Sequence, residues 1–284
     1  MSTPASLSRL GVLAGGGGAP RRLLQFLRDA RRPYYVVCLQ GQADADLGAG
    51  EAHCWLPLGA GERLAQILRD ESVTDIVMIG KVRRPSLHEL RPDAFTLKKL
   101  LQIGFAMLGD DGLLRAVTRL VEAEGFRVVG IQDITQEFLM PEGQLSAAEP
   151  TEQDWHDIRR GAAVARQLGL ADTGQSVIVQ QGMVLGVEAI EGTDALIARC
   201  GALKREGGGG VLVKLCKPQQ DRRLDLPSIG SGTIAALYAA GLAGVAAEAG
   251  KSLCFDRAQT VRDADATGLF LLGFMPDGAA REPT

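Results

Sequence analysis

The segment Arg9–Ala30, RLGVLAGGGGAPRRLLQFLRDA, decides the fold of the first half of the chain. It opens with a short apolar run, Arg9–Ala14, continues with four glycines, Gly15–Gly18, and ends in a helical stretch, Arg21–Ala30. A strand, a glycine turn and a helix in this order are typical of the start of a βαβ unit. In that setting the turn amides and the helix N-terminus can hold a phosphate group.

The glycine turn differs from the dinucleotide fingerprint GxGxxG. Pro20 and Arg21 stand where a third glycine would fall, and no GK[ST] sequence follows. We interpret the turn as a phosphate- or nucleotide-binding loop, and a plain tight turn is the alternative. Its candidate substrate-binding residues are Gly16, Gly17, Gly18 and Ala19.

The chain after this segment continues the alternation of strands and helices. Strands are predicted at Tyr34–Leu39 and Asp75–Ile79, with a helix at Arg63–Asp70 between them. This order predicts an α/β fold with a parallel sheet and helices on both faces. Ligands of such sheets bind at the carboxyl ends of the strands, where Gly80 and Lys81 would lie. Both are therefore candidate substrate-binding residues, with a solvated loop as the alternative.

The length and the local composition predict two domains. A chain of 284 residues fits two domains of roughly 100–200 residues each. Residues 135–152 lose periodicity and gather proline, glycine and acidic side chains, as a connection does. We therefore predict an N-terminal domain over residues 1–134, a linker over 135–152 and a C-terminal domain over 153–284.

The second half also alternates between apolar strands and helices. We predict strands at Ser176–Gln180, Met183–Ala189 and Val211–Leu215, and a helix at Thr193–Cys200. The run Ile234–Ala249 is rich in alanine and glycine and is predicted to form one tightly packed buried helix. Its nearly uncharged part is too short to span a membrane.

Composition excludes several classes of protein. The net charge of −3 argues against a general nucleic-acid binder, which needs a basic surface. Five cysteines without a CxxC pair indicate neither a disulfide framework nor a zinc site, and they fit a reducing cytoplasm. The three histidines are scattered and suggest no catalytic triad. The N-terminus contains no signal-peptide core, so we expect a cytoplasmic protein without a membrane span.

Charged residues gather in Gly210–Thr233, GVLVKLCKPQQDRRLDLPSIGSGT. Cations can hold phosphate oxygens, and carboxylates can hold a divalent metal or orient a water molecule. The combination indicates phosphate-ester chemistry, and the alternative is a solvated charged loop. The charged residues are Lys214, Lys217, Asp221, Arg222, Arg223 and Asp225.

A second group of acidic residues precedes the helix predicted at Thr193. Glu188 falls at an apolar strand position, where a lone carboxylate needs a partner. Glu191 and Asp194 lie at the turn into the helix, and Thr193 is either its cap or a site residue. Together with the aspartates of the charged segment, these carboxylates would make a metal–phosphate site.

Several segments occur in the order of a known family. They are GVLAGGGGAP, GKVRRP, GDDGLL, VIVQQGMVLGVEAIEGTDALI, the charged segment itself and AGLAGVAAEAG. Over nearly its whole length the chain resembles the LpxI-type UDP-2,3-diacylglucosamine pyrophosphatases of lipid A biosynthesis. The most specific parts of the resemblance are EGTD and KPxQDxRxDLPxIG.

The resemblance implies a fold and a reaction. It implies a Rossmann-like N-terminal domain, a distinct α/β C-terminal domain with a mixed sheet, and an active site at the domain interface. The implied reaction hydrolyses UDP-2,3-diacylglucosamine to 2,3-diacylglucosamine 1-phosphate (lipid X) and UMP, with water attacking the sugar-side phosphorus. It also implies Mg²⁺, Mn²⁺ or another divalent ion, a homodimer, no nucleic-acid partner, and membrane contact that is no more than peripheral, at the inner face of the inner membrane. A nucleotide-sugar oxidoreductase and a non-catalytic nucleotide- or lipid-binding module are the alternatives.

The resemblance and the charge pattern together assign roles to residues. Asp225, the aspartate of the DLP motif, is the expected key catalytic residue, and Lys214 and Lys217 would stabilise charge on the pyrophosphate. The candidate metal ligands are Asp225, Glu191, Asp221 and Glu188. The further candidate substrate-binding residues are Gln181, Thr193, Arg223 and Ser228, the last standing where many family members have threonine.

Overall fold

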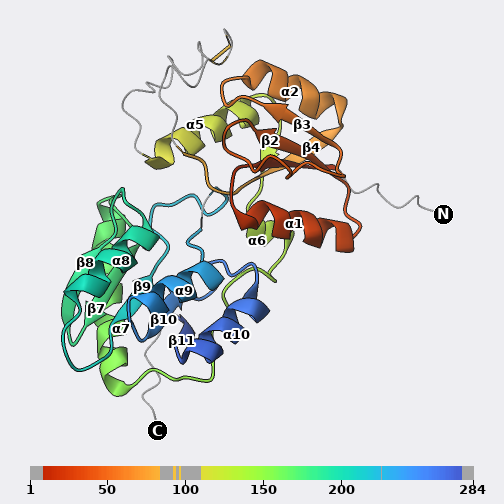
Figure 1. The fold of residues 1–284 in the computed structure, drawn as a ribbon. Helices are drawn as coiled ribbons and strands as arrows, with labels where there is room; N and C mark the ends of the chain where they lie inside the picture. Colours follow the sequence, from red (N-terminus) through yellow and green to blue (C-terminus); the bar gives the residue numbers. More distant parts are fainter. Residues whose placement is uncertain (1–8, 84–91, 94–95, 97–109, 225, 277–284) are drawn as a thin grey trace. The chain divides into compact units, whose positions relative to one another are not determined.

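The chain forms two compact units, which are described separately. The computed structural model describes residues 9–83, 92–93, 96, 110–224 and 226–276. Unit 1 consists of Met1–Ile134 and Asp221–Asp225, and unit 2 of Thr135–Gln220 and Leu226–Thr284 (Figure 1). Unit 1 therefore contains five residues from the charged segment of the second half.

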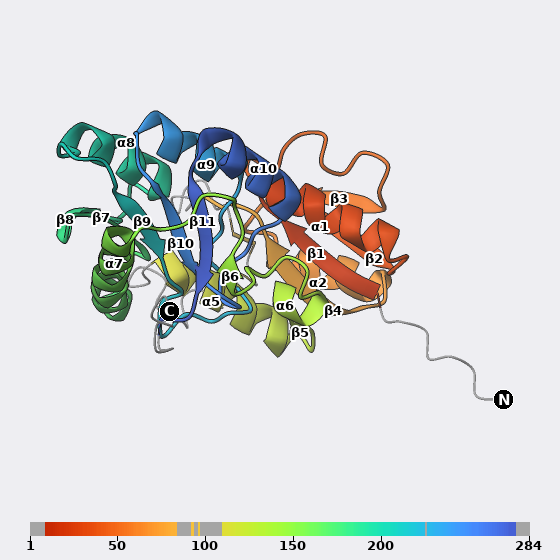
Figure 2. The same ribbon diagram turned by 90° about the horizontal axis from the view of Figure 1, so that it is seen from below.

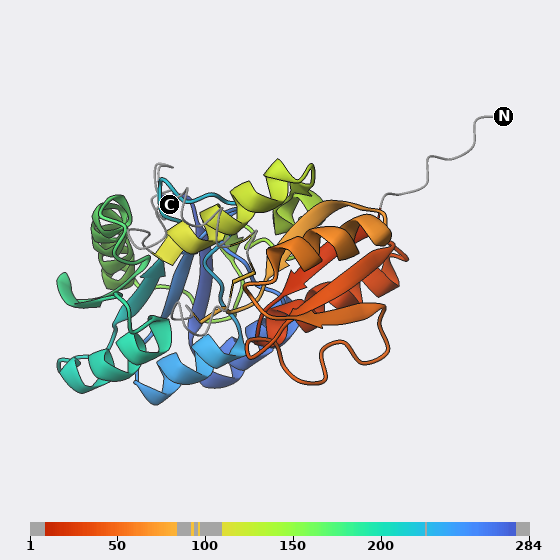
Figure 3. The same ribbon diagram turned by 90° about the horizontal axis from the view of Figure 1, so that it is seen from above.

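Unit 1 is built on a parallel five-stranded sheet. Its strand order is β3 (His53–Leu56), β2 (Tyr34–Leu39), β1 (Arg9–Ala14), β4 (Val73–Ile79) and β5 (Arg127–Val128). Figures 1–3 show α1 (Gly18–Asp29) on one face of the sheet and α2 (Gly61–Asp70) on the other. The remaining described helices are α5 (Asp110–Ala123) and α6 (Ile131–Ile134).

The strand order of unit 1 is that of a Rossmann-like fold, as predicted. From β1 the chain builds outward through β2 and β3 on one side, and then through β4 and β5 on the other. The carboxyl ends of β1 and β4 therefore flank the topological switch point, where ligands of open parallel sheets bind. The glycines after β1 and Gly80 after β4 both lie there.

Unit 2 is built on a mixed six-stranded sheet. Its order is β6 (Gly143–Gln144), β11 (Phe270–Phe274), β10 (Gly244–Glu248), β9 (Val211–Lys214), β7 (Ser176–Gln180) and β8 (Met183–Val187). Strands β9, β10 and β11 are parallel, whereas β6, β7 and β8 pair antiparallel to their neighbours. The predicted α/β fold class, with a parallel sheet in one domain and a mixed sheet in the other, is confirmed.

Alternate residues of the central strands pack on opposite faces of this sheet. Ile178 and Leu212 pack against α8 (Thr193–Leu203), α9 (Ser231–Ala239) and α10 (Arg257–Thr267). Val177 and Val213 pack on the other face against α7 (Glu152–Leu170). Figure 2 shows this arrangement, with α7 on one side of the sheet and the three other helices on the opposite side. Since both faces are covered, the strands read as continuous apolar runs.

The alanine-rich run 234–249 does not form the single helix that we predicted. Helix α9 ends at Ala239, because Gly241 takes a left-handed conformation with φ of +66°. The chain then enters strand β10, where Gly244 lies so close to β11 that a Cβ atom would stand 2.5 Å from the Phe270 carbonyl oxygen. The small residues that suggested tight helix packing instead permit close strand packing.

The predicted linker, residues 135–152, contributes to the core of unit 2. Met140 is buried there, and β6 extends the sheet by pairing with β11. The hydroxyl of Ser146 accepts a hydrogen bond of 2.7 Å from the Leu271 amide. Short edge strands carry little periodicity, which explains why this segment resembled a connection. The sequence pattern of residues 95–108 also predicts a helix, and nearly all of this stretch lies outside the described residues.

Candidate functional site

The glycine turn of unit 1 is fixed to the loop after β4. Gly16 and Lys81 form a two-way backbone bridge, with both N–H···O distances at 2.9 Å. The Gly15 amide donates to the carbonyl of Ile79 at 2.8 Å. The structure therefore brings together the candidates Gly16, Gly17, Gly18, Ala19, Gly80 and Lys81 at the switch point.

The glycines of this turn serve two different purposes. A Cβ atom at Gly15 would stand 2.5 Å from the Lys81 carbonyl oxygen, and one at Gly16 would stand 2.6 Å from that of Gln42. These two positions require glycine because the backbone packs so closely. At Gly17 and Gly18, by contrast, no atom lies within 4 Å of the Cβ position. Helix α1 begins there without a side-chain cap or an acidic first turn, as suits the binding of an anion.

A buried polar network forms the second candidate site, in unit 2. The Lys214 ammonium group donates to the Thr193 hydroxyl at 2.8 Å, and this hydroxyl donates to Glu188 Oε1 at 2.6 Å. Lys214 is only 5% exposed and Glu188 only 7%. Such burial is tolerated because the two charges are joined through a hydrogen-bonded hydroxyl group.

The sheet topology explains why these three residues meet. Lys214 ends β9 and lies opposite Ser176, which begins the antiparallel strand β7. Glu188 directly follows β8, and its amide donates to the carbonyl of Ser176 at 2.9 Å. Glu188 therefore lies just beyond the strand in which it was predicted. The Gln175 amide donates to its second carboxylate oxygen, Oε2, at 3.2 Å.

Two helix N-termini adjoin this network. Thr193 is the first residue of α8, and Lys214 also donates to the carbonyl of Ser228 at 3.3 Å, shortly before α9 begins. The N-caps, Gly192 and Gly230, have no side chain with which to satisfy the first-turn amides. Uncapped amides beside a lysine can bind phosphate oxygens. Four of the candidate site residues, Lys214, Thr193, Glu188 and Ser228, thus lie together in unit 2.

Lys217 and Glu191 are paired with other residues. The Lys217 ammonium group forms an ion pair of 2.9 Å with Asp172, at the end of α7. The Glu191 carboxylate forms an ion pair of 2.8 Å with Arg199. The hydrogen bond from Arg199 is the main reason why the pKa of Glu191 lies below its ordinary value.

Gln181 lies at the opposite end of β7 from Ser176. It occupies the turn between β7 and β8, where it has a φ of +51°. Its amide and that of Gly182 donate to the buried carboxylate of Asp157, at 2.8 and 2.7 Å. The structure thus places this substrate-binding candidate away from the Lys214 network, at the far end of the strand.

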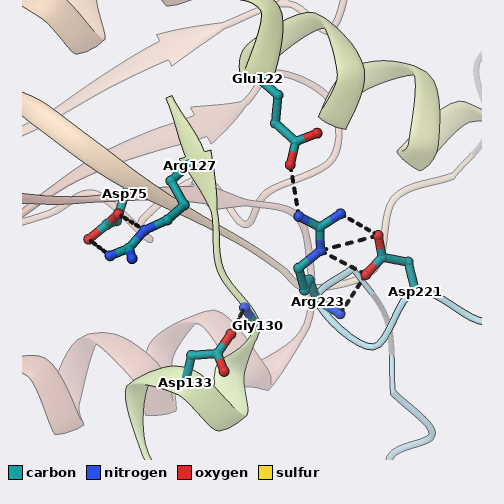
Figure 4. A network of polar contacts seen from close by, with 7 residues as sticks. All are labelled: Asp75, Glu122, Arg127, Gly130, Asp133, Asp221 and Arg223. Atoms are coloured by element: carbon teal, nitrogen blue, oxygen red, sulfur yellow. Dashed lines mark hydrogen bonds and ion pairs between the residues drawn. The ribbon is translucent and has the colours of Figure 1, made fainter. Parts of the chain in front are cut away.

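Asp221 and Arg223 belong to unit 1 rather than unit 2. Figure 4 shows the Arg223 guanidinium group between the carboxylates of Asp221 and Glu122. The hydrogen bond from Arg223 is the largest cause of a lowered pKa at Asp221. Each of these candidates therefore already has a partner of opposite charge.

The described residues contain no preformed metal centre. No three His, Cys, Asp or Glu side chains among them form a group that could hold an ion. Both carboxylate oxygens of Glu188 already accept hydrogen bonds, and Asp221 belongs to the other unit. Asp225, the main candidate ligand and catalytic residue, lies outside the described residues.

Sequence reasoning missed two buried polar residues near the end of β9. Ser176 is fully buried, and its hydroxyl lies 3.4 Å from that of Thr193. Glu248, which ends β10, is 4% exposed and accepts a hydrogen bond of 3.0 Å from the Cys216 amide. A polar residue at the end of an apolar run is the signal that would have found Glu248, whereas the place of Ser176 depends on the pairing of β7 with β9.

The cysteines do not form disulfides, as the sequence indicates. Burial raises the pKa of Cys38 to about 11, and it also raises the pKa of Cys54, Cys200 and Cys254. Thiols with raised pKa values are poor nucleophiles at neutral pH. Within the described part of the chain, the helices are all too short or too polar to cross a membrane.

The comparisons with known proteins identify the family. The family model of the LpxI N-terminal domain matches residues 9–138, and that of the LpxI C-terminal domain matches residues 141–272. The UDP-2,3-diacylglucosamine pyrophosphatase LpxI of Caulobacter vibrioides is 39% identical over 279 residues, covering 95% of this chain and 99% of that protein. Fold and similarity together define a hydrolase that is built of two α/β units. The chain belongs to the LpxI family, so the resemblance noted in its motifs is confirmed.

Proposed function

We propose that this enzyme hydrolyses the pyrophosphate bond of UDP-2,3-diacylglucosamine in lipid A biosynthesis. The products are 2,3-diacylglucosamine 1-phosphate (lipid X) and UMP. The similarity to the Caulobacter vibrioides enzyme over nearly the whole chain supports the substrate. The observation that carries the chemistry is the buried network of Lys214, Thr193 and Glu188 beside two uncapped helix N-termini.

The reaction that we propose needs charge stabilisation above all. A water oxygen bonds to the sugar-side phosphorus while the bond from that phosphorus to the bridging oxygen breaks, and UMP leaves with the electron pair. Negative charge then develops on the leaving phosphate, where a fixed cation stabilises it. Lys214 suits this role because Thr193 and Ser228 hold its ammonium group in place. The water molecule gives up its protons, and Asp225 is the candidate to accept the first.

A divalent ion, Mg²⁺, Mn²⁺ or another, is part of the proposal. When bound, it would neutralise charge on the pyrophosphate oxygens. The described residues alone do not form a metal centre. Magnesium often binds through one or two carboxylates together with substrate phosphates, and Asp225 is the first candidate ligand.

Two further proposals concern the cellular location and the oligomeric state of the enzyme. We propose a cytoplasmic homodimer that meets its lipid substrate at the inner face of the inner membrane through peripheral contact. The diacyl substrate named for the relative supports the membrane contact. Co-sedimentation with vesicles and light scattering would measure the two properties separately.

The central test is hydrolysis of UDP-2,3-diacylglucosamine in H₂¹⁸O with and without Mg²⁺. We expect turnover that EDTA abolishes, and ¹⁸O in the phosphate of lipid X. Label in UMP would refute attack at the sugar-side phosphorus while leaving the activity established. Absence of turnover with every divalent ion would refute the proposed function.

The Asp225→Ala variant tests the residue that the resemblance assigns to catalysis. We expect a folded protein that still binds substrate and retains almost no turnover. Circular dichroism checks the fold, and rapid quench kinetics measures the chemical step. Near-normal hydrolysis at saturating Mg²⁺ would remove Asp225 from the mechanism.

A nucleotide-sugar oxidoreductase is the second candidate function. The strand order β3-β2-β1-β4-β5 favours it, because dinucleotide-binding domains share this order. It requires NAD(P) binding at the glycine turn. Equilibrium dialysis that detects no NAD(P) binding would eliminate this candidate.

A further inference from the structure

The turn 221–224 is a part of unit 1 that comes from the second half of the sequence. The chain leaves unit 2 after Gln220 and returns to it at Leu226. Within the turn, the amides of Arg223 and Leu224 donate to the side chain and the carbonyl of Asp221, at 3.1 and 2.9 Å. These local bonds give the turn a defined shape.

Two contacts attach this turn to the rest of unit 1. The Leu224 side chain packs against the apolar cluster that contains Val121 and Phe126. The Arg223 guanidinium group donates to Glu122 Oε1 of helix α5 at 2.7 Å, across 101 residues of sequence (Figure 4). An apolar contact and an ion pair therefore hold the same turn from adjacent positions.

The guanidinium group of Arg223 is engaged on two sides. Its Nε and Nη2 atoms donate to the Asp221 carboxylate at 3.0 and 2.6 Å, while Nη1 donates to Glu122. These two carboxylates, Asp221 first, raise the pKa of Arg223 above its ordinary value. A guanidinium group held by two carboxylates is already neutralised and would have to break these pairs to bind phosphate.

We propose that Glu122 and Arg223 are positioning residues, which dock on unit 1 the turn 221–224 that directly precedes the DLP motif in the sequence. The inference rests on the proposed function, since it gives the turn a catalytic purpose through Asp225, the next residue of the chain. It replaces the expectation that Arg223 binds substrate directly. It also assigns a role to Glu122, which no sequence motif singled out.

The proposal predicts a specific kinetic pattern. A positioning pair affects the chemical step, so Glu122→Gln is expected to lower kcat roughly three- to fivefold, the scale of a half-exposed ion pair. KM is expected to stay unchanged. In an Arg223→Ala background, Glu122→Ala is expected to cause no further loss, because the partner is already absent. Independent, multiplicative losses of kcat would overturn the proposal.

A direct substrate contact at Arg223 gives a different result. Arg223→Ala would then raise KM strongly, whereas Glu122→Gln would leave kcat unchanged, and this outcome also overturns the proposal. Glu124→Gln is the matched control, because Glu124 lies beyond the same helix and pairs with Arg69. We expect parent-like kcat and KM from this control, and thermal unfolding verifies that every variant is folded.

Hydrogen exchange tests the docking without reference to activity. The amides of Arg223 and Leu224 should exchange faster in Glu122→Gln than in the parent, and unchanged exchange would overturn the proposal. If the parent enzyme failed to hydrolyse UDP-2,3-diacylglucosamine, the proposed function would be refuted. Faster exchange in the same variant would nevertheless establish the docking contact.

Discussion

The two units contain candidate phosphate sites of different kinds. Unit 1 offers a loop of backbone, in which Gly15 and Gly16 pack tightly and Gly17 and Gly18 face open space. Unit 2 offers buried side chains, in which Lys214 is joined to a carboxylate through the Thr193 hydroxyl. A backbone loop can bind an anion without any charged residue, whereas a buried lysine concentrates charge at one point. We propose that the glycine loop of unit 1 binds phosphate and that Lys214 of unit 2 stabilises charge during the reaction.

Loss of the buried cation should have the largest effect. Lys214→Met keeps a long apolar side chain but removes the ammonium group, and we expect kcat to fall by about a hundredfold or more. KM should change much less if unit 1 supplies most of the binding. Steady-state kinetics measures both, with Lys204→Met, at the C-cap of α8, as the control. A large increase of KM with unchanged kcat would reverse the assignment of roles.

Loss of the Thr193 hydroxyl group, which lies between Lys214 and Glu188, should have the second-largest effect on kcat. Thr193→Val leaves Glu188 Oε1 without its donor, and a buried unsatisfied acceptor costs about 1–3 kcal/mol. We expect the transition state to lose a similar free energy, which corresponds to a fall in kcat of about tenfold or more. Thr193→Ser keeps the hydroxyl group and should retain activity close to that of the parent. Equal losses in both variants would show that the hydroxyl group is not the essential feature.

Two alanine substitutions separate packing from binding in unit 1. Gly15→Ala should destabilise the protein by about 1–3 kcal/mol, because its Cβ would clash with a carbonyl oxygen. Gly18→Ala meets no atom and should change stability by less than about 0.5 kcal/mol. It should still raise KM if substrate occupies that space. Urea unfolding and KM measurements on both variants test this, and an unchanged KM in Gly18→Ala would exclude ligand contact there.

The smallest expected effect concerns Asp221 and acid stability. Its pKa is lowered from the ordinary value of 3.8, chiefly by the hydrogen bond from Arg223. The stabilisation is therefore complete above that value and is lost as the pH falls through the lowered native pKa. Asp221→Asn should be less stable than the parent at pH 7 by about 1 kcal/mol or less. Urea unfolding should show this difference shrinking as the pH falls below 3.8, and a difference independent of pH would contradict the ion-pair origin.

The sequence predicted those features that depend on local pattern. The strands Arg9–Ala14 and Tyr34–Leu39 have the predicted bounds, because each is an apolar run between turn residues. The glycine turn was found because only glycine permits such close backbone packing at Gly15 and Gly16. The sequence also singles out Lys214, as a cation of the charged segment, and Thr193, from its position at a helix start.

Features that depend on pairing between distant segments were not predictable. The alanine run 234–249 has no period that marks where α9 ends and β10 begins. Ser176 looks like an ordinary strand residue until β7 is placed beside β9, opposite Lys214. The pairing of Arg223 with Glu122 spans 101 residues, and no local signal encodes it.

The turn 221–224 has a consequence for how such a protein can be inherited. Because the first compact unit includes a loop encoded far downstream, a gene cut near residue 134 would yield an incomplete unit. The N-terminal half alone would lack Leu224 in its apolar cluster. Glu122 would also lose its ion pair with Arg223. We therefore expect the coding regions of the two halves to be transferred between genomes together and not to recombine as separate modules.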